Sequence, residues 1–535
     1  NSITVDSVRT SLASLGLDVN ANSTVSSLTV GHTTPVSIAS SKTLSGAITV
    51  TAGSIKLDEA GTLGSTISMS GGKIDADESL TLSGALTQSG NITIDVADTK
   101  TLTYSGAALN LGAYTLTMSG EGRLSNSNAL VLNNASSKLL LSNSITVDSV
   151  STSLASLGLD VDANSTVSSL TVGHTTPVSI ASGKTLSGAI TVTAGSIKLG
   201  ETGTLASTVS MSGGTLDADE SLTLSGALTQ SGNITIDVAD NKILTYSGAS
   251  LNLGANTLTL SGGGTLSNTN ALVLNHANSL LTLAGILTIR DVDGTTASNS
   301  GKGIQVTSSA TLGDYDLSAV SYLSLAANQT LDGQLNLQTN GELKTSGDGQ
   351  YIGDIELAGG KFSATDNQVL GGTLSITADS ELTVSQGYTL TLSQTGGLAL
   401  GANALTLSGG GSFVSGGLTL NNASSKLLLN SIILDSTSTS SDSLGLDVDN
   451  NSTITALSVG HITPVSIAAN KTLSGAIAVS AGSLKLNETG TLASTIAMGG
   501  GTLDADESST VSGALTQTAD ITIDVADTKT LTYSG

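Results

Sequence analysis

The stretch that decides the fold is residues 43–100, which contains three similar lines: TLSGAITVTAGSIKLDEAG (43–61), TLGSTISMSGGKIDADESL (62–80) and TLSGALTQSGNITIDVADTK (81–100). Each line opens with Thr-Leu and continues with two short segments in which apolar and polar residues alternate, such as Ile48 and Val50 around Thr49. Alternation with a period of two places one side of a strand in a core and the other side in water. A fixed repeat of about 20 residues is typical of solenoids, whose turns stack on one another. Each line is therefore predicted to form one turn of a parallel β-helix.

The same pattern extends over the first 142 residues if turns of unequal length are allowed. The predicted turns begin at Ser2, Thr24, Thr43, Thr62, Thr81, Thr101 and Arg123. The predicted fold class is all-β, a right-handed parallel β-helix (β-solenoid) of about 20-residue turns in a single elongated rod. A right-handed coil is expected because turns with variable corners do not fit the strict hexapeptide period of left-handed coils. At about 4.8 Å per stacked strand, about 26 turns predict a rod on the order of 125 Å long.

A longer repeat is superimposed on the short one. It predicts repeat unit 1 at 1–142 with about seven turns, unit 2 at 143–284, a divergent unit 3 at 285–429 and an incomplete unit 4 at 430–535. Unit 3 differs most in its head, GILTIRDVDGTTASNSGKGIQ, so a specialised site is expected there if one exists; simple drift of an older copy is the favoured explanation of the difference. Neither end resembles a cap, and we expect further copies or end-to-end self-association to continue a filament.

The composition narrows the class of protein. The chain has 63 glycines, three prolines, no cysteine, 2% aromatic residues and 38% hydrophobic residues, which predicts a narrow aliphatic core without disulfides or thiolate metal sites. The formal charge of −24 argues against nucleic acid as a partner and is typical of a self-repelling extracellular surface that could recruit divalent cations. No apolar run approaches the roughly 20 residues of a transmembrane segment.

The GGTLxxxxxLTLSG-like turns, such as residues 214–226 and 263–275, resemble the β-solenoid passenger regions of bacterial autotransporter and filamentous-haemagglutinin-like surface adhesins. The resemblance is one of composition and period, and it covers essentially the whole chain. It implies a secreted bacterial protein that is extracellular or at the cell surface, with cell-surface or matrix glycans as partners. The chain departs from the family in lacking a recognisable export domain, membrane barrel or tip module, which leaves the export route open.

Histidine and proline recur in one motif. His32, His174 and His461 occupy the same place in VGHTTPV or VGHITPV, each three residues before a proline. Copies about seven turns apart would lie on the order of 34 Å from each other, too far to act as one metal or catalytic site. We therefore interpret them as exposed corners, and His276, which replaces the Asn134 of unit 1, in the same way.

Acidic residues recur about 20 positions apart, so stacking should arrange them in columns. These candidates for weak calcium binding are Glu59, Asp75, Asp77, Asp95, Glu201, Asp217, Asp219, Asp237, Glu488, Asp504, Asp506 and Asp524. A plain solvated acidic face is the favoured interpretation, weak Ca²⁺ bridging through oxygen ligands is the next, and acid/base catalysis is the least favoured. Asp291, Asp293 and Gly294 match a calcium loop only in part, and the SGGG segments at 261–264 and 408–411 are expected to be turns.

The sequence as a whole favours a non-enzymatic extracellular fibre, a rigid acidic stalk or filament segment of a giant repetitive surface protein, with no cofactor. One alternative is a polysaccharide-binding or polysaccharide-cleaving β-helix, although eight Tyr, two Phe and no Trp offer few sugar contacts. A second alternative is an ice-binding solenoid, because outward Thr49, Ser68 and Thr87 recur from turn to turn.

Overall fold

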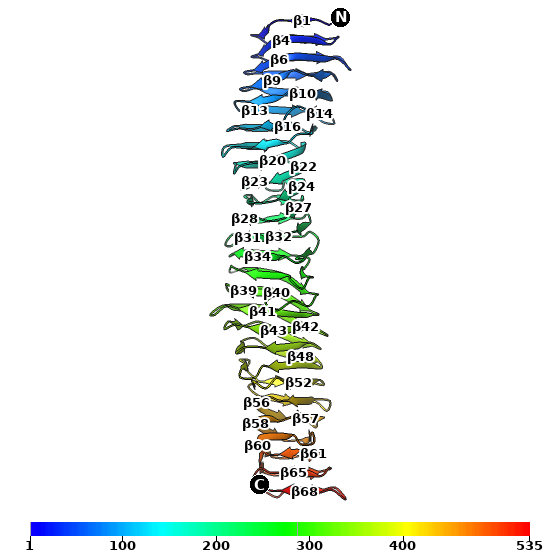
Figure 1. The fold of residues 1–535 in the computed structure, drawn as a ribbon, viewed down its shortest axis with the longest axis vertical. Coiled ribbons are helices and arrows are strands. Elements are labelled where there is room, and N and C mark those ends of the chain that lie inside the picture. Colours follow the sequence, from blue (N-terminus) through cyan, green and yellow to red (C-terminus); the bar gives the residue numbers. More distant parts are fainter. Residues whose placement is uncertain (1, 286) are drawn as a thin grey trace. The chain divides into compact units, whose positions relative to one another are not determined.

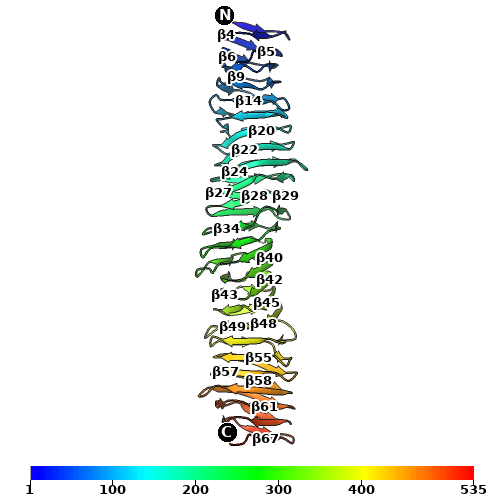
Figure 2. The same cartoon turned by 90° about the vertical axis from the view of Figure 1, so that its right-hand side faces the viewer.

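The chain is built from short parallel strands. A computed structural model describes residues 2–285 and 287–535, and within these ranges it contains strands and turns but no helix. The strands stack as a β-solenoid of about 26 turns with roughly 20 residues in each. In the turn of β9 (Thr66–Met69) and those beside it, the strands of successive turns lie one above another in both views (Figures 1 and 2). The prediction of an all-β parallel β-helix is confirmed.

Contacts divide the chain into two compact units. The first comprises Asn1–Asn252 and Asn256–Asn270, and the second Leu253–Ala255 and Ala271–Gly535. These compact units differ from the four repeat units of the sequence at 1–142, 143–284, 285–429 and 430–535. The division into four repeat units stays a prediction.

One turn of the first unit shows how the sequence forms the coil. It consists of β8 (Thr62–Leu63), β9 (Thr66–Met69) and β10 (Lys73–Ala76), followed one turn later by β11 (Leu80–Leu82), β12 (Leu86–Gln88) and β13 (Ile92–Val96). The first two strands of each turn belong to one sheet, called sheet A, and the third belongs to sheet B. Ile67 pairs with Leu86, and Ile74 pairs with Ile94, so apolar residues stack on apolar residues. The predicted anchor and two alternating segments are these three strands.

Other turns join the two strands of sheet A into one long strand with a kink. In β24 (Thr185–Val192) the kink lies at Gly188, whose φ of 120° is accessible to few residues other than glycine. The register with β22 (Ser165–Val172) shifts at the same place, between Val167 and Leu170. The glycine therefore allows one strand to serve two faces of the coil.

The core follows the predicted alternation. Ile48, Ile67 and Ile74 are at most 2% exposed, whereas Thr49 and Ser68 face outward. Complete burial of such an aliphatic side chain contributes about 1.5–3 kcal/mol, so the stacked column is the main source of stability. The assignment of inside and outside positions is confirmed.

The predicted register is wrong at one anchor. Turn starts at Thr81 and Thr101 would place Leu82 beside Leu102, but Leu82 pairs with Tyr104 and Leu102 pairs with Leu80. Tyr104 is buried, accepts a hydrogen bond from the Leu86 backbone N–H at 3.2 Å and donates one to the Ala107 carbonyl at 2.5 Å. The ring thus fills the core two residues later than expected, because its hydroxyl finds partners at the corner.

Polar corner side chains connect consecutive turns. The Oδ1 atom of Asn164 accepts a hydrogen bond at 3.0 Å from the backbone N–H of Thr185, which opens the next turn. Asn233 accepts one from Thr257 in the same manner at 2.8 Å. These contacts satisfy backbone donors where the ladder between strands is interrupted, so asparagine at such corners connects one turn to the next.

Candidate functional site

The predicted acidic columns form on the outer face of sheet B. Asp75 lies in register with Asp95, Asp217 with Asp237 and Asp504 with Asp524, each pair on adjacent strands. Because stacked strands are about 4.8 Å apart, the two carboxylates of each pair belong to neighbouring positions of one column. Three further candidates are exposed in the corners that follow their strands: Glu59 and Glu201 in the first compact unit and Glu488 in the second.

Lysines lie among these carboxylates, and no role was predicted for them from the sequence. Lys73 forms ion pairs with Asp75 at 3.2 Å and with Asp95, so it bridges the stacked pair. Partial burial opposes a rise in the pKa of Lys73, but the hydrogen bonds to Asp95 and Asp75 outweigh it and raise the pKa above its ordinary value. Lys56 pairs with Asp77 at 2.6 Å on the same face. In unit 1 the acidic column is therefore partly neutralised.

In the second sequence copy, one lysine fewer lies beside the acidic column. Thr215 stands in the position of Lys73, and Lys198 instead contacts Asp217 at 2.9 Å and Asp219 at 3.3 Å. Burial raises the pKa of Asp217; the hydrogen bond from Lys198 opposes this, while the charges of Asp219 and Asp237 add to it. Lys485 contacts Asp504 and Asp506 in the last copy at 3.4 and 3.1 Å. The lysine is thus a regular partner of the acidic column.

The acidic residues of the solenoid are spread over many turns. Within residues 2–285 and 287–535, no group of three or more Asp, Glu, His or Cys side chains is arranged to hold a metal ion. The carboxylates are stacked in pairs with lysine between or beside them, which favours ion pairing. Calcium bridging at the twelve candidate positions stays a prediction.

The histidines occupy exposed corners, as the sequence indicated. In each motif a threonine two residues later donates its hydroxyl to the histidine carbonyl, at 2.9 Å for His32 and His174 and at 3.1 Å for His461. His276 accepts a hydrogen bond at its Nδ1 from the Asn278 backbone N–H at 3.0 Å. Asn134 accepts the equivalent bond from Ser136 at 2.9 Å. The exchange of Asn for His therefore preserves a turn.

A second acidic group lies in the divergent region of the second unit. Asp291 and Asp293, on β38 (Thr288–Gly294), are in register with Asp314 and Asp316 on β40 (Ala310–Leu317). The side-chain amide of Asn336 donates to Asp314 at 2.8 Å and to Asp316 at 2.7 Å. Only the two aspartates of the first strand, Asp291 and Asp293, were predicted from the sequence as part of a candidate site. The two later aspartates follow at a constant offset of one turn, which was the signal available in the sequence.

Burial and repulsion act together on this group. Burial raises the pKa of Asp293, and the charges of Asp291, Asp316 and Asp314 raise it further. For Asp314, burial and the charges of Asp316 and Asp291 raise the pKa, against the hydrogen bonds from Asn336 and the Tyr315 backbone. The group therefore holds negative charge at a cost in folding stability.

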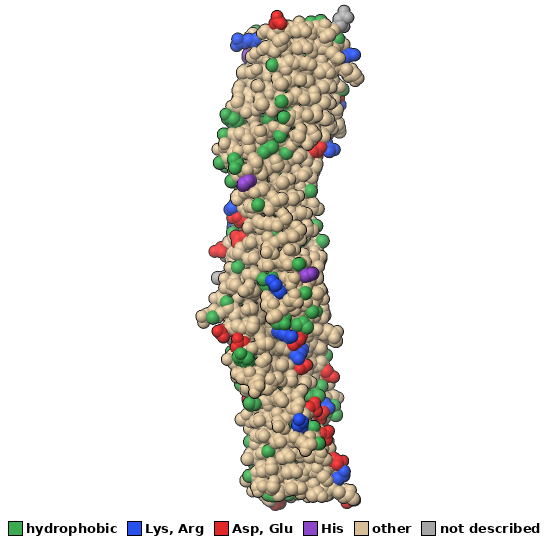
Figure 3. Space-filling view, in the orientation of Figure 1, with side chains coloured by type: hydrophobic (Ala, Val, Ile, Leu, Met, Phe, Trp, Pro, Cys, Tyr) green, Lys and Arg blue, Asp and Glu red, His purple; other side chains and the backbone are tan. Residues whose placement is uncertain are grey.

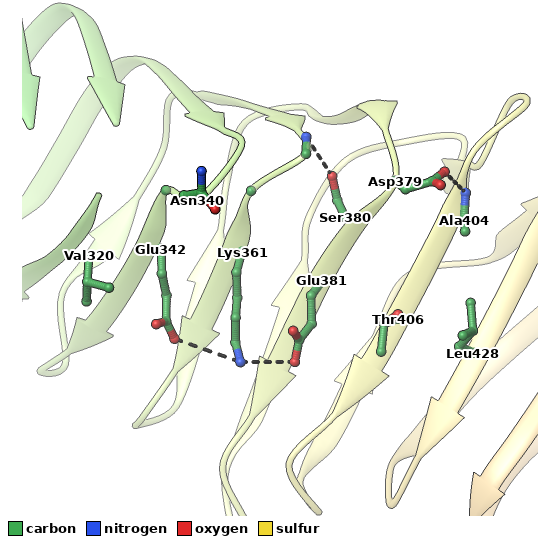
Figure 4. Close-up of a pocket in the computed structure, with 13 residues that line it drawn as sticks. Val320, Asn340, Glu342, Lys361, Asp379, Ser380, Glu381, Ala404, Thr406 and Leu428 are labelled. Carbon is green, nitrogen blue, oxygen red and sulfur yellow. Dashed lines mark hydrogen bonds and ion pairs between the residues drawn. The ribbon is translucent and has the colours of Figure 1, made fainter. Parts of the chain in front are cut away.

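A groove runs along the outer face of sheet B in the same unit, with a volume of about 510 Å³ (Figure 4). Its floor crosses β41 (Val320–Leu325), β43 (Glu342–Ser346), β46 (Lys361–Ala364), β49 (Ser380–Val384), β52 (Ala404–Ser408) and β55 (Lys426–Asn430). One residue of each strand forms a column in register: Val320, Glu342, Lys361, Glu381, Thr406 and Leu428. The groove lies in the divergent region where a specialised site was expected, but none of its residues was named from the sequence.

The surface around these sites mixes both signs of charge. On the face seen in Figure 3, basic side chains lie beside acidic ones, and most of the surface is neither charged nor apolar. This agrees with the ion pairs of sheet B.

Comparisons with protein-family models, with curated proteins and with solved structures find no match. The described parts of the chain include no helix of the length and apolarity needed to cross a bilayer.

Proposed function

We propose that this protein is a non-enzymatic structural and adhesive fibre segment: a stiff solenoid stalk of a repetitive bacterial surface protein, working outside the cell. The observation that carries the proposal is the recurrence of the same turn-to-turn contact in sequence units 1, 2 and 4. Lys100 pairs with Glu78 at 2.7 Å, and Lys242 with Glu220 and Lys529 with Glu507 each at 2.5 Å. Duplication of a unit that carries both its core and its corner contacts lengthens a stalk without redesign. The resemblance to autotransporter and filamentous-haemagglutinin-like adhesins supports the same role.

The joints between sequence copies support extension by further copies. At the joint between units 1 and 2, Leu124 in the last turn of unit 1 pairs with Val147 in the first turn of unit 2. The Arg123 guanidinium donates two hydrogen bonds to the Asp148 carboxylate, at 2.9 and 3.0 Å. At the joint between the divergent unit 3 and unit 4, Phe413 pairs with Leu434 in the same way. The last turns of units 1 and 3 differ in sequence, yet each stacks on nearly the same first turn of the following unit. Self-association of copies, in one chain or between chains, would use this joint.

The proposal is tested by imaging and by location. Electron microscopy of the purified chain should show extended particles, and immunogold labelling of the producing cells should place the protein on their surface. Compact particles would contradict the proposed stalk. Labelling confined to the cytoplasm would contradict the proposed place outside the cell.

A second candidate, ice binding, has one observation in its favour. Thr171, Thr191, Ser210 and Thr229 form a column in register on four adjacent strands of sheet A, all facing outward. A regular array of hydroxyl groups can match the spacing of ordered water. Thermal hysteresis of the purified chain measures this directly, and its absence at millimolar protein would remove the candidate.

A further inference from the structure

The ladder formed by the second strand of each turn in sheet A is interrupted at three places. This strand normally pairs with its counterpart in the next turn, as β9 pairs with β12. Within residues 2–285 and 287–535, that pairing is missing between β12 and β15 (Leu109–Asn110), between β30 (Leu228–Gln230) and β33 (Leu251–Asn252), and between β48 (Leu374–Ala378) and β51 (Leu398–Ala399). We call these three passages from one turn to the next the interrupted steps.

The other two faces of the coil stay paired at an interrupted step. At the first one, β11 pairs with β14 (Thr101–Tyr104) at three positions, and β13 pairs with β16 (Thr115–Gly120) at five. An intact step has all three ladders: where β19 (Lys138–Leu141) pairs with β21 (Gly158–Val161), both parts of sheet A pair as well. Fewer backbone hydrogen bonds therefore join the two turns at an interrupted step, and each such bond contributes to stability.

Side chains replace the missing ladder. At the first interrupted step the Tyr104 hydroxyl accepts a hydrogen bond from the Leu86 backbone N–H at 3.2 Å and donates one to the Ala107 carbonyl at 2.5 Å. The side-chain amide of Gln88 donates to the Leu111 carbonyl at 2.8 Å. The two ends of β12 are thus held to the next turn by side chains.

The second interrupted step repeats the tyrosine contact. The Tyr246 hydroxyl accepts a hydrogen bond from the Leu228 backbone N–H at 3.1 Å and donates one to the Ala249 carbonyl.

The third interrupted step, in the divergent region, makes the same kind of contact with a different residue. The Oε1 atom of Gln394 accepts a hydrogen bond from the Leu374 backbone N–H at 2.7 Å, and its Nε2 atom donates to the Gly397 carbonyl at 2.5 Å. The side-chain amide of Asn403 donates to the Ile376 carbonyl at 3.0 Å. A glutamine amide therefore does at this step what a tyrosine hydroxyl does at the other two.

The wall of the coil is open at the third interrupted step. A hollow of about 570 Å³ is lined by residues 374–376 of β48 on one side and by Ala399 of β51 on the other, with Gln394 at the corner. Water in this hollow competes for the polar groups that would otherwise join the two strands.

A tyrosine at the corner does not by itself interrupt the ladder. Tyr351 donates hydrogen bonds to the Asp354 carbonyl at 3.3 Å and to the Gly333 carbonyl of the preceding turn at 3.1 Å. At that step β42 (Thr330–Gln338) pairs with β45 (Asp354–Ala358) at five positions. The Tyr351 hydroxyl therefore adds to a complete ladder, whereas the Tyr104 hydroxyl takes the place of one.

We propose that the three interrupted steps are the points at which the solenoid opens, each held closed by one corner side chain, Tyr104, Tyr246 or Gln394. Each turn rests only on its neighbours, so a step with two ladders separates before the steps with three. A stalk under load along its axis would open and close at these steps while the turns between them stay folded. The inference concerns the coil itself and does not rest on an adhesive role or on the location of the protein.

Native-state hydrogen exchange of the complete chain tests the proposal. The amides that join β13 to β16, across the first interrupted step, should exchange about tenfold faster than those that join β19 to β21, across an intact step. Both sets lie in sheet B, where the ladder is complete at both steps. A difference between them therefore reports opening of the whole step and not the missing bonds of sheet A.

Two matched variants test the corner side chain. Tyr104→Phe keeps the ring and removes the hydroxyl, and it should speed exchange between β13 and β16 by about fivefold more. Tyr351→Phe makes the same change at an intact step, and it should alter exchange between β43 and β46 by less than about twofold.

Either of two results would overturn the proposal: equal exchange across the interrupted and intact steps of the unaltered chain, or equal effects of the two variants. If Tyr104→Phe does not fold, the comparison within the unaltered chain decides alone. Extended particles in the electron microscope are expected in every case, so a failure here leaves the proposed stalk standing.

Discussion

The kink glycine of sheet A provides the sharpest test of how the coil is built. A Cβ atom at Gly188 would lie 1.8 Å from the Val167 carbonyl oxygen of the preceding turn. Gly46, Gly333 and Gly475 meet the same obstacle at 1.7 Å in other turns. We expect Gly188→Ala to be strongly destabilising, because the obstacle is backbone and cannot rotate away.

The magnitude follows from the contact distance. Ordinary contact begins at 3.4 Å, so β24 and β22 would have to separate by about 1.6 Å at this point, the difference between 3.4 and 1.8 Å. That separation sacrifices about two ladder hydrogen bonds, worth about 0.5–1.5 kcal/mol each. The unfavourable φ of 120° costs about 1–3 kcal/mol more once a side chain is present. The total is about 3 kcal/mol or more.

Gly183 is the matched control, five residues earlier in the corner before β24. Its φ of 70° is also positive, but a Cβ atom there meets nothing within 4 Å. Gly183→Ala should therefore cost about 1 kcal/mol, the strain of a left-handed residue alone.

Native-state hydrogen exchange of the complete chain is the assay, because each turn rests only on its neighbours and opens locally. A loss of about 3 kcal/mol corresponds to about 100-fold faster exchange of the amides in β22 and β24. Similar exchange rates in the Gly188→Ala and Gly183→Ala variants would refute the role given to the close backbone approach.

Three further predictions concern a turn, the core and pH. Thr99 has a φ of 62° although it is β-branched, whereas Asn241 occupies the equivalent turn at 61°; Thr99→Asn should stabilise its turn by about 1 kcal/mol, measured as slower local exchange, with Asn241→Thr giving the reverse. Ile67→Asp should cost several kcal/mol, because it buries an unpaired charge in an aliphatic column, while Thr49→Asp should change thermal stability little; equal effects would contradict the assignment of inside and outside. The raised pKa of Asp314 means that folding stability is lost as pH rises through its folded-state pKa, so Asp314→Asn should raise the melting temperature at pH 7, and the gain should disappear near pH 3.

The sequence alone determined which residues lie inside and which outside. Ile48 and Ile67 are buried and Thr49 is exposed, as the alternation predicted, because the direction of a side chain on a strand follows from its parity and needs no knowledge of distant residues. The repeat near 20 likewise predicted stacked turns, since each line has the apolar residues for one layer of core and no more. The exposed corner positions of His32 and His174 followed from the same count.

The tertiary structure decided the register between turns and all that depends on it. Corner length is free to vary, so the sequence could not show that Tyr104 rather than Leu102 would lie beside Leu82. Nor could it show that Lys73 would reach both Asp75 and Asp95. The groove with Glu342, Lys361 and Glu381 arises from residues about 20 positions apart that share no local motif. Their meeting depends on the offset between neighbouring strands, and that offset is set by packing of the core against the preceding turn.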